Sequence, residues 1–476
     1  MQQKSDTSRI GSGFAETFQW FENLEREHDL VSLEIAGVRI WQLLRGRMFD
    51  RILFAGDLAL DRESRFTTIA ERIAGRMRAI WREPSSLMPS RGLVSVGRGL
   101  SAALFAPWVA WQSRRLLASP PSAEVVVARF NRLMNDRYDL TAPVSDNACL
   151  FLTKPKFAYP LTQMNIRIKD IERAARSRPR TVLESFDREK IIGLAALLED
   201  SFGFSKDELQ RQITLEIDRF VRSEAVLGEL LERCGTREIY LCWNSLYYPL
   251  VSAARNRSIR TIEFQHGTIT LYHCHYCYRH GVVMPYLPDE IRFFGQAWID
   301  QSPLPPGVKA INAGAPHLRR LLDDYSAVPK QEDLVLVVSQ TVVGLHLYRF
   351  TVEVARLRPD LNFVFKLHPA ERYQDLAGYV PDPPSNIRIV SGKGDTYRLM
   401  ASAAYQMGVS STTLEEGFAF GNRTVVVPLP SYEYLEPEIE RGHATLARTP
   451  QEAASLLSEV TPLCDDVGLY FSNLAK

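Results

Sequence analysis

Short runs of β-branched residues alternate with helix-spaced apolar residues in this chain, and this alternation constrains the fold more than any other feature. It is clearest from Leu334 to Leu457. Strands that alternate with helices form right-handed βαβ units and a mostly parallel sheet. We therefore predict a Rossmann-like α/β domain here, with strands over 334–338, 362–366, 386–390, 404–407 and 423–427 and helices over 345–357, 395–402, 412–420 and 451–459.

The same alternation occurs earlier in the chain. It predicts strands over 124–130, 148–153, 238–243, 261–264, 290–294 and 308–312 and helices over 206–234, 248–257 and 316–325. The polar segment from Asp324 to Asp333 carries a proline and is typical of a linker. We predict an α/β fold with two Rossmann-like domains facing a cleft, residues 124–328 and 329–476. A helical N-terminal region, residues 1–123, precedes them.

The N-terminal region is locally basic although the whole chain of 476 residues has a formal net charge of only +1. Residues 65–115 are rich in arginine and enclose an apolar segment, Gly99 to Trp111, which is too short to span a bilayer. Such a segment can lie in the headgroup plane of an anionic membrane. The alternatives are a core helix flanked by solvated arginines and an RNA-binding patch, although the rest of the chain does not favour nucleic acid.

The remaining composition favours a cytoplasmic protein that is peripheral on the inner membrane. The chain has 6 cysteines, which are scattered as in a reducing compartment rather than paired as in a disulfide framework. The first residues lack the apolar core of a signal peptide, and no apolar run is long enough to cross a membrane.

A histidine follows the predicted strand that ends at Lys366. The segment contains Lys366, His368, Pro369 and Arg372. A histidine at the carboxyl end of a parallel strand faces the crevice in which open α/β sheets bind ligands, and it can donate a hydrogen bond to a phosphate oxygen. Lys366 and Arg372 add positive charge. The structural alternative is that His-Pro only ends the strand.

A hydroxyl-rich turn occurs two predicted strands later. Ser410, Ser411 and Thr412 lie where a strand leads into a helix, and Glu415 and Glu416 follow about one turn on. The N-terminus of such a helix can bind phosphate, and a carboxylate can hydrogen-bond a ribose diol. Alternatively, one hydroxyl only caps the helix and the glutamates form a solvated first turn.

These two motifs together resemble the donor-binding half of GT-B glycosyltransferases of bacterial capsule and O-antigen assembly, such as Kdo (3-deoxy-manno-octulosonate) transferases. The resemblance implies a nucleotide-sugar donor, CMP-Kdo among the candidates, as a substrate rather than a cofactor, and a glycan or lipid-linked acceptor. It implies that His368, Ser410 and Ser411 hold the donor phosphate and that Glu415 or Glu416 holds the ribose. The strand-end residues Ser339 and Gln340 would line the same cleft.

A Gln-His-Gly triplet in the first predicted domain also resembles these enzymes. Glu263 lies in the predicted strand and His266 on the loop after it. We predict that both are catalytic, because an inverting transferase needs a base for the acceptor hydroxyl and a double-displacement enzyme needs a carboxylate nucleophile. The sequence leaves open which applies. The structural alternatives are an outward-facing strand residue for Glu263 and a loop-capping role for His266.

We predict no metal site. The segment from His273 to Cys277 has the ligand types of a zinc site, but a structural site needs a second pair of ligands. The chain has no Asp-x-Asp triplet and no P-loop, so helix N-termini and positive side chains would offset the charge of a leaving group. Rival functions are a CDP-polyol phosphotransferase, a UDP-sugar 2-epimerase and a non-catalytic glycan-assembly scaffold.

Overall fold

The computed structural model describes residues 13–60, 108, 110–129, 149–153, 164–341, 343–376, 380, 382–390, 395–458 and 461–474. The chain divides into two compact units. The first comprises Met1–Arg132, Pro143–Ile262 and His280–Asp289, and the second comprises Leu133–Ala142, Glu263–Arg279 and Glu290–Lys476. The predicted domain boundaries at 123/124 and 328/329, and the cleft, stay predictions.

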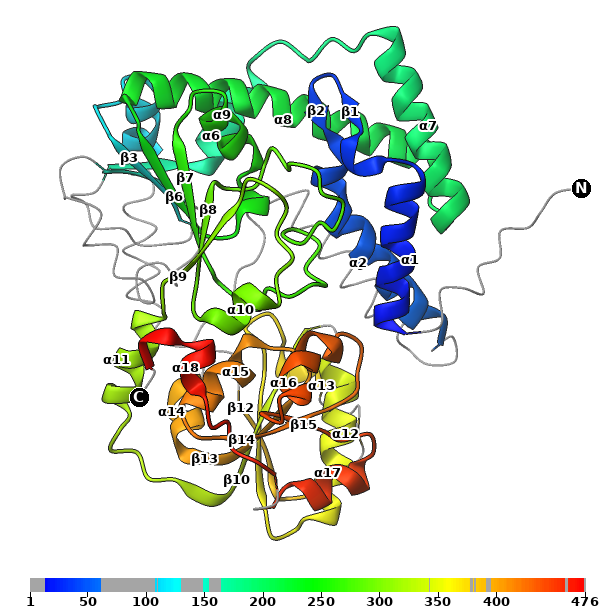
Figure 1. Ribbon diagram of the computed structural model, residues 1–476, viewed down its shortest axis with the longest axis vertical. Helices are drawn as coiled ribbons and strands as arrows, with labels where there is room; N and C mark the ends of the chain where they lie inside the picture. The colour runs from blue at the N-terminus through cyan, green and yellow to red at the C-terminus, as the bar shows by residue number, and fades with distance from the viewer. Residues whose placement is uncertain are drawn as a thin grey trace, which may run out of the picture. The chain divides into compact units, whose positions relative to one another are not determined.

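A seven-stranded sheet has the strand order β5-β4-β3-β6-β7-β8-β9 (Figure 1). Its strands are β3 (Val125–Arg129), β4 (Cys149–Thr153), β5 (Met164–Arg167), β6 (Glu238–Leu241), β7 (Arg260–Phe264), β8 (Glu290–Phe293) and β9 (Lys309–Asn312). The pairings of β3 with β4 and β6, of β4 with β5 and of β8 with β9 are parallel. Counted along the chain, the order reverses between β3 and β6, as in the Rossmann fold.

Helices alternate with or follow these strands in the chain, and α6, α8 and α9 share an apolar core with the sheet. The helices are α6 (Ile168–Arg176), α7 (Ser185–Phe202), α8 (Lys206–Cys234), α9 (Tyr248–Arg255), α10 (Gln296–Asp300) and α11 (Pro316–Asp324). Ser205 caps α8 by accepting a hydrogen bond from the Glu208 N–H, and Gly235 ends it in the left-handed conformation that glycine adopts without strain. One core joins α8 and α9 to the strands and includes Val126, Leu150, Ile239, Leu227, Leu230 and Leu250.

Two N-terminal helices, α1 (Phe14–Glu27) and α2 (Ile40–Leu60), enclose a buried ion pair. The Glu25 carboxylate accepts hydrogen bonds from the Trp41 indole at 2.5 Å and from the Arg45 guanidinium at 2.6 and 2.9 Å. Both charged side chains are fully buried. Around them, Phe18 and Phe21 pack against Phe49 with ring centroids 5.3 and 5.4 Å apart.

The six-stranded sheet of the second unit has the order β12-β11-β10-β13-β14-β15. Its strands are β10 (Gln331–Val338), β11 (Asn362–Lys366), β12 (Ile387–Val390), β13 (Ala403–Gly408), β14 (Arg423–Val426) and β15 (Thr445–Leu446). All neighbouring strands are parallel. Counted along the chain this is the Rossmann order, 3-2-1-4-5-6, which reverses between β10 and β13 and places the ligand crevice at their carboxyl ends.

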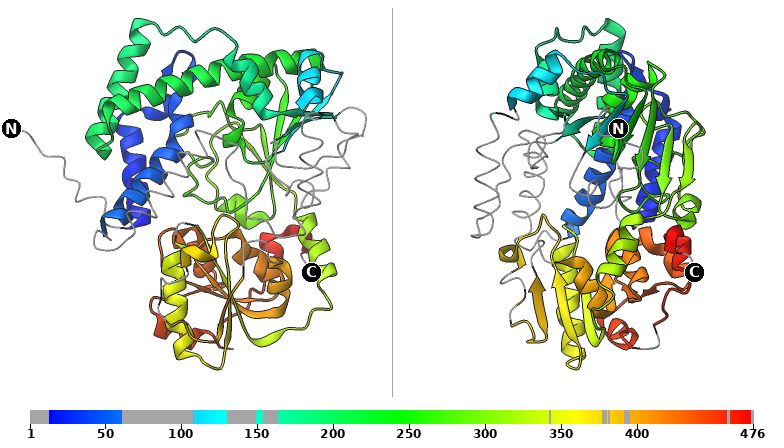
Figure 2. Two further views of the ribbon diagram at one scale, coloured as in Figure 1. Left: turned by 180° about the vertical axis from the view of Figure 1, so that it is seen from behind. Right: turned by 90° about the vertical axis from the view of Figure 1, so that its left-hand side faces the viewer.

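Helices cover this sheet in the manner of a doubly wound fold. They are α12 (Gly344–Leu357), α13 (Tyr373–Leu376), α14 (Thr396–Ser402), α15 (Thr412–Ala419), α16 (Glu436–Glu440), α17 (Pro450–Leu456) and α18 (Val467–Tyr470). Figures 1 and 2 show α12 and α17 on one side of the strands and α14 and α15 on the other. The core between α12, α17 and the sheet includes Val335, Leu347, Val352, Phe365, Ala453 and Leu457.

The prediction of an α/β chain with two Rossmann-like sheets is confirmed. The predicted strands and helices occur with ends shifted by a few residues; β10, for example, begins at Gln331, inside the segment predicted as a linker. Three elements, β5, α6 and α7, were not predicted from the sequence. In β5 only one residue of Met164–Arg167 is β-branched, and its role in the sheet comes from pairing with β4.

The basic segment 65–115 lies outside the described residues except for 108 and 110–115. In the described part, Trp111 is half exposed and the Arg115 guanidinium lies 5.4 Å from the centre of its ring. Among the described helices, none combines the length and the apolar character needed to cross a membrane. Membrane association of this segment stays a prediction.

Candidate functional site

The carboxyl ends of β10 and β13 carry a hydrogen-bonded polar cluster at the point where the strand order reverses. The Gln340 side-chain carbonyl accepts from the Ser410 N–H at 3.1 Å, and its amide donates to the Ser410 hydroxyl at 3.2 Å. The Ser410 hydroxyl also lies 2.9 Å from that of Ser431, after β14. Gln340 and Ser410 were predicted. Ser431 was not predicted, because it belongs to no sequence motif. What distinguishes it is its backbone conformation, since a φ of 81° is unusual for a residue with a side chain.

The His-Pro loop after β11 is organised by Glu371, a residue to which the sequence assigned no role. The Glu371 carboxylate accepts hydrogen bonds from the Ser339 hydroxyl at 2.9 Å and from the backbone N–H of His368 at 2.6 Å. It also lies against Gly344, the first residue of α12, where the helix dipole favours negative charge. A carboxylate therefore joins the end of β10, the His-Pro loop and a helix N-terminus.

His368 is exposed, and its ring is set up as a neutral hydrogen-bond donor. Its Nδ1 accepts from the Ala370 N–H at 3.2 Å, which leaves the proton of the neutral ring on Nε2. Although part of the residue is exposed, neighbouring atoms shield its ring from water, and this desolvation, followed by the nearby Lys366 charge, lowers the pKa of His368. Both effects favour the neutral ring, so Nε2 can donate one hydrogen bond to a ligand.

The cations predicted for this site differ in accessibility. Lys366 is buried and its ammonium donates to the Leu367 carbonyl at 3.2 Å. Burial lowers the pKa of Lys366, and the Glu371 carboxylate opposes this shift. Pro369 and Arg372 are exposed on the loop. The structure thus places Arg372, rather than Lys366, on the surface.

The helix α15 begins directly after the Ser410–Ser411 turn. The Ser411 hydroxyl accepts from the Thr413 N–H at 3.3 Å and so caps the helix. Glu415 or Glu416 was predicted to hold the ribose; both are buried, with 0% and 1% exposure, and the ribose contact stays a prediction. His317 of α11 lies 3.6 Å from the Glu416 carboxylate.

Glu415 belongs to a cluster of buried acids. Burial is the main cause that raises the pKa of Glu415 well above its usual range, and repulsion from the nearby Glu438 carboxylate raises it further. Burial also raises the pKa of Glu438, whose carboxylate accepts from the Gln301 amide at 2.8 Å. Gln301 and Glu438 are separated by 137 positions in the chain, so no local sequence signal indicated this cluster.

The predicted catalytic loop follows β7 and belongs to the second unit. Glu263 is fully buried and accepts a short hydrogen bond from the Tyr276 hydroxyl. Gln265 fixes the loop: its side-chain carbonyl accepts from the Phe294 N–H at 2.8 Å, and its amide donates to the Gly267 carbonyl at 2.9 Å. His266, between them, is only partly buried. Of the two predicted catalytic residues, His266 is the one with exposed surface.

The same loop contacts α15. The Thr412 hydroxyl accepts from the Thr268 N–H at 2.8 Å and lies 3.0 Å from the Thr268 hydroxyl. The Thr268 hydroxyl in turn donates to Glu415 at 3.4 Å. The structure therefore joins the Gln-His-Gly segment to the helix that begins at the Ser410–Ser411 turn. Thr412 was predicted to bind the donor; Thr268 was not predicted at all.

The segment from His273 to Cys277 forms turns. The Cys277 thiol lies 2.9 Å from the Thr270 carbonyl, and the His273 ring packs edge-on against the Tyr276 ring at 4.7 Å. Within the part of the chain that the structure describes, no group of three or more potential ligands is arranged to hold a metal ion.

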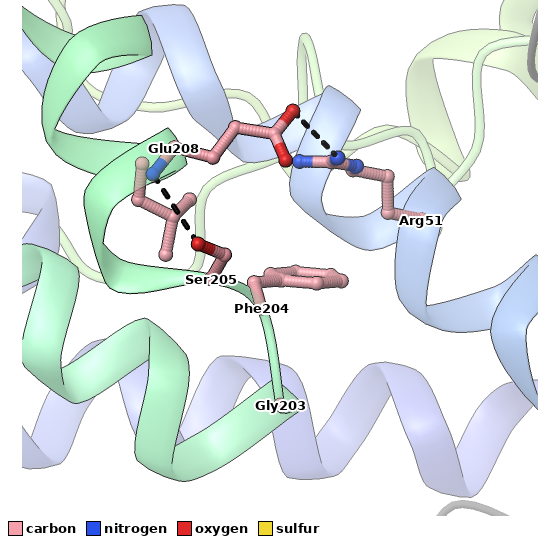
Figure 3. A pocket seen from close by; sticks show the side chains of 6 residues that line it. Arg51, Gly203, Phe204, Ser205 and Glu208 are labelled. Carbon is pink, nitrogen blue, oxygen red and sulfur yellow. Dashed lines mark hydrogen bonds and ion pairs between the residues drawn. The ribbon is translucent and has the colours of Figure 1, made fainter.

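A pocket in the first unit lies between α2 and the start of α8 (Figure 3). Its lining includes Arg51 and Glu208, which form an ion pair at 3.9 Å, and Ser205, whose hydroxyl accepts from the Glu208 N–H. The Arg51 guanidinium also lies 4.8 Å from the centre of the Phe204 ring. These contacts cap α8 and join it to α2, so we interpret the pocket as structural.

No family model matches the sequence, and no curated protein is significantly similar to it. The chain is similar to the solved structure of MurG from Acinetobacter baumannii, with 11% identity, a TM-score of 0.43 and coverage of 75% of this chain and 96% of that chain. It is also similar to CalG4, the calicheamicin glycosyltransferase, with 11% identity, a TM-score of 0.41 and coverage of 73% of this chain and 91% of that chain. A third similar structure is UDP-GlcNAc 2-epimerase from Neisseria meningitidis bound to UDP-GlcNAc, with 14% identity, a TM-score of 0.37 and coverage of 50% of this chain and 72% of that chain. At these TM-scores the fold assignment rests on the strand orders of the two sheets.

Proposed function

We propose that this protein is a GT-B-type glycosyltransferase that binds a nucleotide-sugar donor at the carboxyl edge of its six-stranded sheet. One observation carries the proposal: Gln340 and Ser410 meet at the reversal point of a Rossmann-ordered sheet, where such sheets bind nucleotides. The exposed His368 and the N-terminus of α15 supply the donors that a phosphate needs.

The motif resemblance narrows the donor within this proposal. The His-Pro loop and the Ser410–Ser411 turn are similar to those of enzymes that use CMP- or CDP-activated donors, and CMP-Kdo is the donor we propose. The acceptor would be a surface glycan or a lipid-linked glycan. In that reaction an acceptor hydroxyl oxygen attacks the anomeric carbon, the bond from that carbon to the phosphate oxygen breaks, and CMP leaves.

The chain's own residues would supply a base and charge stabilisation. We propose His266 as the base that takes the acceptor proton, because it is partly exposed, whereas Glu263 is fully buried against Tyr276. Glu263 would position the loop. The His368 Nε2–H and the backbone N–H groups at the start of α15 would stabilise the phosphate that leaves.

The test is calorimetric titration of the full chain with CMP, CDP and UDP. We expect CMP to bind most tightly. His368→Ala should weaken CMP binding by roughly three- to tenfold, which corresponds to the loss of one hydrogen bond. His28→Ala, which removes an exposed histidine at the end of α1, is the matched control and should bind like the wild type.

The outcomes separate the rival functions. If only UDP binds, the result favours a UDP-sugar 2-epimerase over a transferase with a CMP-linked donor. If CDP binds most tightly, it favours a CDP-polyol phosphotransferase. If none of the three nucleotides binds, the donor site at this edge is refuted. Unchanged CMP affinity in His368→Ala would remove that residue from the site while leaving the rest of the proposal standing.

A further inference from the structure

We propose that Thr412 is a positioning residue that couples occupancy of the Ser410–Ser411 turn to the conformation of the loop carrying His266. The inference rests on the proposed function, because it takes the turn as the place where the donor phosphate binds. It assigns Thr268 and Thr412 a role that neither local motif indicates.

The Thr412 side chain has a limited capacity for hydrogen bonds. A hydroxyl has one proton to donate. The Thr412 oxygen accepts from the Thr268 N–H at 2.8 Å, and the two threonine hydroxyls are 3.0 Å apart. Either hydroxyl can be the donor across this distance. When the Thr268 hydroxyl donates to Glu415 at 3.4 Å, Thr412 is the donor of the pair, and its proton then points toward Thr268 rather than toward a phosphate.

Thr412 also occupies a position in the helix that an anion would affect. It is the first residue of α15, directly after the turn in which Ser411 acts as N-cap. An anion at this N-terminus would be held by backbone N–H groups of the first turn. Any shift of that turn on binding moves the Thr412 Cα, and with it the oxygen on which the Thr268 N–H depends.

Thr268 is connected to the proposed base by a short segment of chain. Only Gly267 separates Thr268 from His266, and a Cβ at Gly267 would lie 3.4 Å from the Thr412 hydroxyl. On the other side, Gln265 is buried and bonded to Phe294 and Gly267. The loop is therefore held at two points, and His266 lies between them.

Hydrogen–deuterium exchange with CMP as the probe tests this coupling without a known acceptor. In the wild type, saturating CMP should slow exchange in a peptide covering residues 264–272. In Thr412→Val, which removes the acceptor of the Thr268 N–H, exchange in this peptide should be about tenfold faster without CMP, the equivalent of one lost hydrogen bond. The slowing by CMP should also be lost. Calorimetry on each variant gives the CMP concentration that saturates it, so that exchange is compared at equal occupancy.

Two variants serve as controls. Thr413→Val makes the same chemical change one residue further along α15 and should retain the CMP effect on residues 264–272. Thr412→Ser restores a hydroxyl and should rescue the coupling. If Thr412→Val unfolds, Thr268→Val, which keeps the backbone N–H but removes the hydroxyl pair, should reduce the CMP effect partially.

The failure modes are distinguishable. If the wild type does not bind CMP, the proposed donor fails. If it binds CMP but Thr412→Val shows the same CMP-induced protection at residues 264–272 as the wild type, the coupling is overturned and the donor site stands. Equal loss of protection in Thr413→Val would also overturn it, because the effect would then belong to the helix as a whole.

Discussion

Glu415→Gln should stabilise this protein, and the gain should grow as the pH rises. Glu415 is fully buried, and burial, followed by repulsion from Glu438, raises its pKa well above the usual value of 4.5. In the unfolded chain the group titrates near that usual value. Between the two pKa values the folded protein therefore holds a proton that the unfolded chain has lost, and the free energy of unfolding falls as the pH increases.

The magnitude follows from the linkage of one proton. Glu415 changes the free energy of unfolding by at most about 1.4 kcal/mol per pH unit. Between pH 5 and 7 the free energy of unfolding of the wild type should therefore fall by up to about 3 kcal/mol, and that of Glu415→Gln should not show this decrease. Below about pH 4.5 both states are protonated and this contribution no longer changes with pH. Glutamine also keeps an oxygen that can accept the hydrogen bond from the Thr268 hydroxyl, so the loop contact should survive.

Urea denaturation at half-unit steps from pH 5 to 8 measures this difference. Glu353→Gln, which changes an exposed glutamate of α12, is the control, and its curve should follow that of the wild type within about 0.5 kcal/mol. A difference between Glu415→Gln and the wild type that stays constant over the whole range would show that Glu415 titrates normally. The reasoning from burial and Glu438 would then be wrong.

Two further perturbations test other parts of the structure. Glu25→Gln should lower the free energy of unfolding, measured by urea denaturation, by about 3–5 kcal/mol, because it leaves the buried Arg45 charge without its partner. Glu229→Gln, at an exposed ion pair, is the control and should lower it by less than about 1 kcal/mol. Equal losses in the two variants would show that burial of the ion pair does not determine the cost. Glu371→Gln keeps an acceptor for the His368 N–H but removes a negative charge from the proposed phosphate site, so calorimetry at low salt should show CMP binding about threefold tighter. Weaker binding would mean that the charge of Glu371 is needed to shape the loop.

The sequence could predict the strands and which of the segments that follow them are neighbours, because both depend on local patterns. Buried parallel strands are apolar on both faces, so Leu334–Val338 and its counterparts stand out as short β-branched runs. Parallel strands bring their carboxyl ends to one edge. The segments after β10 and β13 were therefore expected to be neighbours, and the bonds between Gln340 and Ser410 fulfil that expectation.

The burial of Glu415 and Glu416 could not be predicted in the same way. A short helix with acidic residues in its first turn is typically solvated there. In this protein Leu414 to Phe418 are all buried. The reason is tertiary: Thr268 contacts Glu415, and Glu438 lies close enough to shift its pKa, and both come from segments remote in sequence. A helical periodicity argument assumes one solvated face, and α15 has none over these residues.

The hydrogen-bond partners of the hydroxyl groups in the Ser410–Thr412 turn indicate a structural role for these side chains. From sequence they were candidate donors to a phosphate. In the structure the Ser410 hydroxyl bonds to Gln340 and Ser431, the Ser411 hydroxyl caps α15, and the Thr412 hydroxyl holds Thr268. Side chains that are bonded in this way fix the shape of the turn. A phosphate bound there would depend on backbone N–H groups and the helix dipole, because these are the groups that a capped helix N-terminus presents. Replacing one hydroxyl would then act chiefly through the geometry of the turn, and the Thr412 hydroxyl, which accepts from the Thr268 N–H, also joins the turn to the loop that carries His266.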